Sequence, residues 1–88
     1  MSLTLSILTN DNQEVLLRAV GELNRRSLVI QSLSWTPLDS GDYEMIVTIN
    51  GDEHRLSRIV YQLARLINVL EVNRVERREP TSESGMRS

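Results

Sequence analysis

The chain has 88 residues, with twelve acidic and ten basic side chains, a net charge of −2 and no cysteine. This length supports a single domain with a small core, so part of its stability is expected to come from a partner. The missing cysteines exclude a disulfide framework and a thiolate metal site, and basic residues spread along the chain argue against a nucleic-acid partner.

The first apolar segment predicts a strand and no targeting sequence. Leu3, Leu5 and Ile7 alternate with polar residues, which is the period of a strand with one buried face. No basic leader precedes this segment, and no apolar run in the chain reaches the ~20 residues that cross a bilayer. A cytoplasmic protein without a membrane partner is expected.

Residues 13 to about 26 predict an amphipathic helix. Asp11 or Asn12 is expected to cap it, and Glu14 and Arg18 have the i, i+4 spacing of an ion pair on its wet side. The apolar stripe consists of Val15, Leu16, Ala19, Val20 and Leu23. Residues 28–36 predict a second strand, with a bulge near Gln31 and Ser32 because the alternation fails there.

The second half of the chain repeats strand, helix and strand. Pro37 suits the end of an edge strand, residues 39–42 predict a hairpin turn, and residues 43–49 alternate as a third strand. Asp52 is expected to cap a second helix, whose apolar stripe consists of Leu56, Ile59, Val60, Leu63 and Ile67. Residues 69–75 predict the fourth strand. The domain is therefore expected over residues 1–78, followed by a disordered tail over residues 79–88.

The order β-α-β-β-α-β predicts the ferredoxin-like α+β fold, a four-stranded antiparallel sheet with two helices on one face. The other sheet face has no cover within the chain. Leu8 and Ile46 add apolar side chains on that face, so a homodimer or a larger partner is expected to cover it.

Groups that could carry chemistry are few. His54 beside Asp52 and Glu53 is expected to be a solvated residue of the first helical turn, because one turn cannot converge all three side chains on a metal. Asp39, Asp42 and Glu44 lack the loop length of a calcium site. Trp35 is expected to pack at a subunit contact and not to stack on a nucleic-acid base. No catalytic residue and no metal ligand is assigned.

The joint order of several short motifs resembles the ACT domain of the small, regulatory subunit of acetolactate synthase (acetohydroxyacid synthase). The resemblance covers about residues 3–78 and is most similar to the short, single-domain type such as the isozyme II small subunit. The matching residues are Leu8-Thr9-Asn10, Arg18, Gly21, Arg26, Ile30-Gln31-Ser32-Leu33, Pro37, Gly51-Asp52-Glu53, Leu56, Ile59, Gln62-Leu63, Leu66 and Val69-Leu70-Glu71-Val72.

This resemblance implies a non-catalytic partner of an enzyme. The large catalytic subunit of the family carries thiamine diphosphate, magnesium and FAD, and it forms acetolactate at the start of branched-chain amino-acid biosynthesis. The small subunit binds it and raises its activity, and needs no cofactor of its own. In valine-sensitive members an amino-acid effector lies at the dimer interface, between the loop after the first strand and the second strand of the neighbour. The corresponding residues here are Asn10, Asp11, Asn12, Gln13, Val29 and Ile30.

Two departures from the family pattern predict weak or absent valine feedback. Glu14 stands where the family has a loop glycine, and its carboxylate would repel that of an amino acid; Val29 replaces the asparagine that helps to hold valine. Ser27 also replaces a glycine that is common before the second strand. The alternative to a regulatory subunit is a free-standing ACT-type amino-acid sensor that acts on another target.

Overall fold

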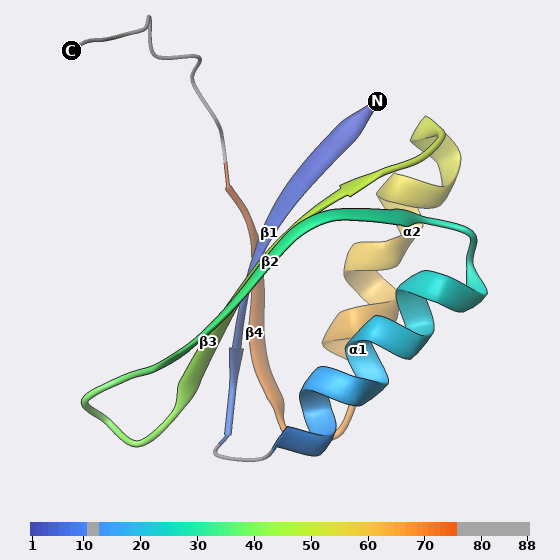
Figure 1. Ribbon diagram of the computed structural model, residues 1–88. Coiled ribbons are helices and arrows are strands. Elements are labelled where there is room, and N and C mark those ends of the chain that lie inside the picture. The colour runs from blue at the N-terminus through green and yellow to red at the C-terminus, as the bar shows by residue number, and fades with distance from the viewer. Residues whose placement is uncertain (11–12, 76–88) are drawn as a thin grey trace, which may run out of the picture.

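The computed structural model describes residues 1–10 and 13–75, and it has the predicted order of elements. The elements are β1 (Ser2–Thr9), α1 (Gln13–Arg25), β2 (Val29–Pro37), β3 (Tyr43–Asn50), α2 (Glu53–Ala64) and β4 (Val69–Arg74). Both helices lie on the same side of the sheet (Figure 1). The predicted ferredoxin-like fold is confirmed, whereas the expected capping by Asp11 or Asn12 and the expected tail lie outside the described residues.

The four strands form one antiparallel sheet in the order β2-β3-β1-β4, so β2 and β4 are its edges. The pairing of β2 with β3 shifts register between Ile30 and Ser32, which leaves Gln31 as the predicted bulge. Pro37 ends the edge strand β2, where its missing N–H costs no ladder bond. Gly41, at φ 96°, adopts the left-handed backbone of the following hairpin turn.

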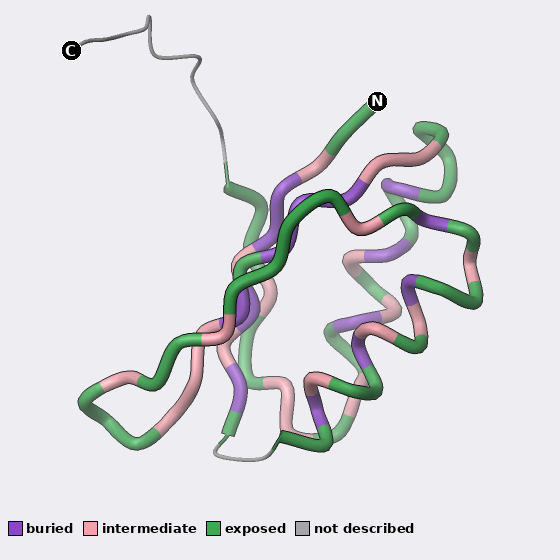
Figure 2. The backbone as a smooth tube through the Cα atoms, in the orientation of Figure 1, coloured by how far each residue is buried: buried purple, intermediate pink, exposed green. Residues whose placement is uncertain are grey.

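The core lies between the sheet and the two helices, as the buried segments facing each other in Figure 2 indicate. The sheet contributes Leu5, Ile7, Met45, Val47 and Ile49, and the helices contribute Val15, Ala19, Leu23, Leu56, Ile59 and Leu63. All of these side chains are buried, and burying one Leu or Ile stabilises the fold by roughly 1.5–3 kcal/mol. The apolar residues that recur every 3.6 positions in the helices and every second position in the strands therefore pack together in one core.

The open face of the sheet is more polar than the sequence pattern suggests. Leu8 and Ile46 are on it, but their cross-strand neighbours are polar: Glu44 and Glu71 lie beside Leu8, and Ser6 and Ser34 lie beside Ile46. Thr4 and Thr48 are buried and share a hydrogen bond of 2.9 Å between their hydroxyls, and Ser6 donates to Glu44. Leu8 and Ile46 therefore lie on the face opposite the core, as expected, but among polar neighbours, because the strands alternate Ser and Thr with the core residues. The cover of this face by a partner stays a prediction.

Local hydrogen bonds fix both ends of α2. At the start of α2, the Asp52 carboxylate accepts the N–H of Arg55 at 2.8 Å, which confirms the predicted cap. At the other end, Arg65 caps the helix after Ala64. The placement of Ile67 on the apolar stripe of this helix is therefore wrong: Ile67 lies beyond the helix and is 68 % exposed, because helical spacing no longer applies there.

The end of α1 is a Schellman motif. The N–H of Leu28 donates to the carbonyl of Leu23, and the N–H of Ser27 donates to the carbonyl of Asn24, both at 3.0 Å. Ser27 adopts φ 61°, the left-handed conformation that this motif requires of its first residue beyond the cap. The buried side chains of Leu23 and Leu28 supply the apolar contact that accompanies the motif.

Candidate functional site

The loop that precedes α1 begins at Asn10, which is tied to the loop that precedes β4. Its side-chain amide donates to the Asn68 carbonyl oxygen Oδ1 at 3.1 Å, and its backbone N–H donates to the Asn68 main-chain carbonyl at 3.0 Å. The Thr9 hydroxyl donates to the main-chain carbonyl of Asn10. The side-chain nitrogen of Asn10 is therefore bonded within the chain, and its side-chain oxygen is the group that could bind a ligand.

Gln13 and Glu14 form the first turn of α1 and are exposed to solvent. Glu14 accepts a hydrogen bond from Arg18 at 3.2 Å, which confirms the predicted ion pair. Both side chains are about half exposed, at 48 % for Arg18 and 61 % for Glu14, so this ion pair is screened by solvent. Two other predicted site residues, Asp11 and Asn12, lie outside the described residues.

Val29 and Ile30 lie at the opposite end of the sheet from Asn10. Val29 pairs with Asn50, which pairs with Ser2 at the start of β1, whereas Asn10 follows the last residue of that strand. Ser2 and Thr9 are separated by about 23 Å along β1, at about 3.3 Å per residue. Val29 is 61 % exposed and Ile30 packs on the core. Within one chain, the two halves of the predicted effector site do not meet.

No group of three His, Cys, Asp or Glu side chains within residues 1–10 and 13–75 is placed to hold a metal ion. His54 lies exposed on the first turn of α2, as the sequence indicates. Trp35 stacks on Tyr43 of the neighbouring strand, with ring centroids 4.8 Å apart and an angle of 14° between the planes. Its role at a subunit contact stays a prediction. No helix within the described part of the chain is long and apolar enough to cross a membrane.

Asn68 is a residue that sequence reasoning missed. It has φ 74°, and asparagine is among the few residues that tolerate this left-handed conformation. Ile67-Asn68 directly before a strand is therefore a signal for a tight turn. Its pairing with Asn10 joins residues 58 positions apart, which no local pattern shows.

The chain is similar to known proteins in sequence and in fold. No family model matches the chain. A protein of Mycolicibacterium smegmatis named acetolactate synthase small subunit is 35 % identical over 82 residues, which are 92 % of this chain and 47 % of that protein. The chain therefore spans about half the length of this curated relative.

Solved structures agree on the fold. The small subunit of acetolactate synthase from Thermotoga maritima superposes with a TM-score of 0.75 at 19 % identity, over 86 % of this chain and 48 % of that one. The ACT domain of GTP pyrophosphokinase from Chlorobium tepidum gives 0.71 at 14 % identity, over 85 % and 97 %. The chain has the ACT fold. The resemblance of this ACT-fold chain to acetolactate synthase small subunits is also confirmed.

Proposed function

We propose that this chain is the regulatory ACT domain of an acetolactate synthase small subunit, which binds the catalytic large subunit and raises its activity. The observation that carries the proposal is 35 % identity over 82 residues to a protein of that name. The large subunit would carry the thiamine diphosphate, magnesium and FAD of the reaction. The chain itself is proposed to be non-catalytic, as the small-subunit name of that relative implies.

A homodimer through the ACT domain is part of this proposal. The edge strand β2 leaves one row of backbone groups without a partner strand in the described chain, which is a template for pairing with a second copy. Asn10 and Val29 also lie at opposite ends of the sheet, so an effector site that uses both needs two chains. Symmetric pairing of two copies would supply one half of the site from each chain.

Valine feedback is proposed to be weak or absent. The Glu14 carboxylate lies at the helix start, where an amino-acid carboxylate would otherwise meet free backbone N–H groups. The Asn10 amide already donates to Asn68, and the aliphatic Val29 offers no polar side-chain contact. A like charge in a partly screened site costs about 1–3 kcal/mol, which weakens binding roughly ten- to a hundredfold.

The test combines activation and feedback in one assay. Purified chain is added to the acetolactate synthase large subunit of the same organism, and acetolactate formation is measured with and without valine. We expect activation by the chain, no acetolactate from the chain alone, and little inhibition by valine. Calorimetry on the complex should give a dissociation constant for valine weaker than about 100 μM, which corresponds to a binding free energy near −5.5 kcal/mol.

The matched control for activation is Ile59→Asp. Ile59 is fully buried, so a carboxylate there unfolds the domain, and activation should disappear. A large subunit that neither co-purifies with the wild-type chain nor changes its activity would contradict the regulatory subunit and favour a free-standing sensor. Tight valine binding would contradict only the feedback part of the proposal.

A further inference from the structure

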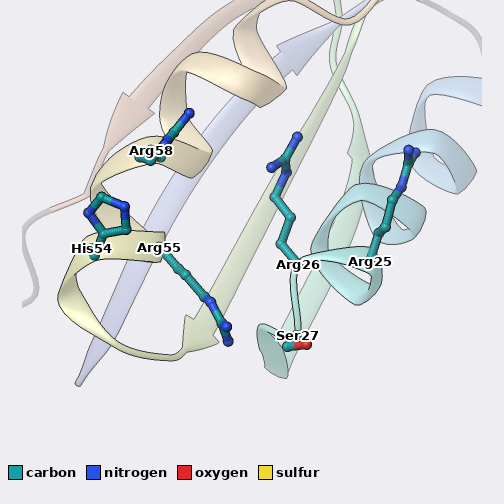
Figure 3. Close-up of a pocket in the computed structure, with 6 residues that line it drawn as sticks. All are labelled: Arg25, Arg26, Ser27, His54, Arg55 and Arg58. Atoms are coloured by element: carbon teal, nitrogen blue, oxygen red, sulfur yellow. The ribbon is translucent and has the colours of Figure 1, made fainter.

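A pocket of about 320 Å³ lies between the end of α1 and the first turns of α2. Arginine dominates its lining, which consists of Arg25, Arg26, Ser27, His54, Arg55 and Arg58. Figure 3 shows Arg26 rising between the two helices, while Arg55 reaches from α2 toward Ser27. We call this site the arginine pocket. It is distinct from Asn10 and Asn68, which lie at the far end of β1.

The arginine pocket concentrates the positive charge of a chain that is acidic as a whole. Every basic side chain in the sequence other than His54 is an arginine, and four of the seven described arginines line this one pocket. Two of them follow one another at the end of α1, and two are three residues apart on α2. The α1–α2 packing therefore creates a cluster that the sequence spreads over more than 30 positions.

The acidic side chains near the arginine pocket balance only part of this charge. Glu22 accepts hydrogen bonds from Arg25 at 2.9 Å and from Arg26 at 3.2 Å, so one carboxylate serves two guanidinium groups. Asp52 lies 3.6 Å from Arg55. Glu53, on the same turn, lines a different pocket beside Met1 and Arg74.

Arg58 adds a further positive charge to the arginine pocket. It is exposed and has no ion-pair partner among the described residues. The hydroxyl of Ser27 makes no hydrogen bond within this part of the chain either, so it is available to a ligand. Two carboxylates against four guanidinium groups leave the pocket with a net positive charge.

We propose that the arginine pocket binds a phosphate-bearing anion. Planar guanidinium groups match phosphate oxygens in paired, charge-assisted hydrogen bonds, and arginines from both helices line this pocket. An amino acid is disfavoured, because its ammonium group would meet the same arginines. The volume is at the lower end of the range for small-molecule sites, about 300–1,000 Å³, and it suits a diphosphate or a small phosphate ester.

The test is a titration of the full 88-residue chain with inorganic diphosphate at low salt, followed by calorimetry and by backbone amide shifts. We expect saturable binding with a dissociation constant below about 1 mM. The largest amide shifts should occur at Ser27, Arg55 and Arg58. Added salt should weaken the binding, since these arginines are in contact with solvent.

Two variants with the same change of charge separate a built site from general attraction. Arg58→Gln removes a donor from the arginine pocket and should weaken diphosphate binding about tenfold. Arg18→Gln removes an arginine elsewhere on α1 and should change it by less than about twofold, because that charge is largely screened. Circular dichroism of both variants checks that they fold.

The proposal is overturned if diphosphate does not saturate the chain at millimolar concentration, if both variants weaken binding equally, or if the amide shifts centre on other residues. Parallel titrations with ATP and glycerol 3-phosphate identify the source of the phosphate. Tighter binding of ATP than of diphosphate assigns the pocket to a nucleotide, and tighter binding of glycerol 3-phosphate assigns it to a small phosphate ester. These titrations need no large subunit, so their failure leaves the proposed regulatory function untouched.

Discussion

Replacing Ser27 by glycine should stabilise the domain. Ser27 is the left-handed residue of the Schellman motif at the end of α1, with φ 61°, a position where glycine is usual. A side chain with a Cβ costs about 1–2 kcal/mol in this conformation, whereas glycine costs about 0.5–1 kcal/mol through the flexibility of the unfolded chain. The expected net gain for Ser27→Gly is therefore about 0.5–1 kcal/mol.

Urea denaturation of the full chain measures this gain directly. Thermal denaturation gives a second measure of the gain. For a domain of this size, 1 kcal/mol shifts the melting temperature by roughly 4–8 °C, so Ser27→Gly should raise it by about 2–8 °C. The Ser27→Ala variant keeps the Cβ, and it should lack the gain. The Ser27 hydroxyl makes no hydrogen bond among the described residues, so its loss should not obscure the comparison.

Ser34→Gly is the matched control. Ser34 is an exposed serine of β2 with ordinary backbone angles, so glycine there should destabilise the domain by about 0.5–1 kcal/mol. If Ser27→Gly is no more stable than Ser27→Ala, or if Ser34→Gly gains as much, the left-handed strain at Ser27 is not the cause and the argument fails.

Two further predictions concern the start of α2 and the turn before β4. Asp52→Ala should lower the free energy of unfolding by about 1 kcal/mol, because the Arg55 N–H loses its cap. Asp52→Asn should lower it by only about a few tenths of a kcal/mol, since asparagine also caps. Equal losses in the two variants would mean that the exposed ion pair with Arg55 matters more than the cap. Asn68→Ala should lower the free energy of unfolding by about 1 kcal/mol more than Asn68→Gly. Both variants lose the hydrogen bond to the Asn10 side chain, but only glycine adopts φ 74° without strain. Equal urea midpoints for the two variants would refute the claim that the left-handed backbone at Asn68 is strained.

Much of this fold follows from local sequence patterns. The spacing of apolar residues along α1, the cap at Asp52, the bulge at Gln31 and the strand end at Pro37 all depend on residues within one turn or one strand step. Backbone hydrogen bonding and the two periods of side-chain direction act over that same short range. The order of six elements and the ferredoxin-like fold could therefore be predicted.

Local patterns failed where a helix ended or where two elements met. Ile67 continued the helical spacing past the cap at Arg65, because the pattern alone does not show where the backbone stops being helical. Leu8 and Ile46 suggested an apolar open face, yet their cross-strand neighbours on that face are mostly polar. Neighbours across a sheet depend on strand order and register, which are tertiary properties.

The candidate sites were decided almost wholly by tertiary structure. Asn10 meets Asn68 because the end of β1 and the start of the neighbouring strand β4 lie at the same end of the sheet, and Val29 is kept away from Asn10 by the length of β1. Arg26 and Arg55 line one pocket only because both helices pack on one sheet face. Contacts between residues this far apart in sequence form when burial of the shared core outweighs the entropy of closing the intervening chain, and neither quantity can be read from a local pattern.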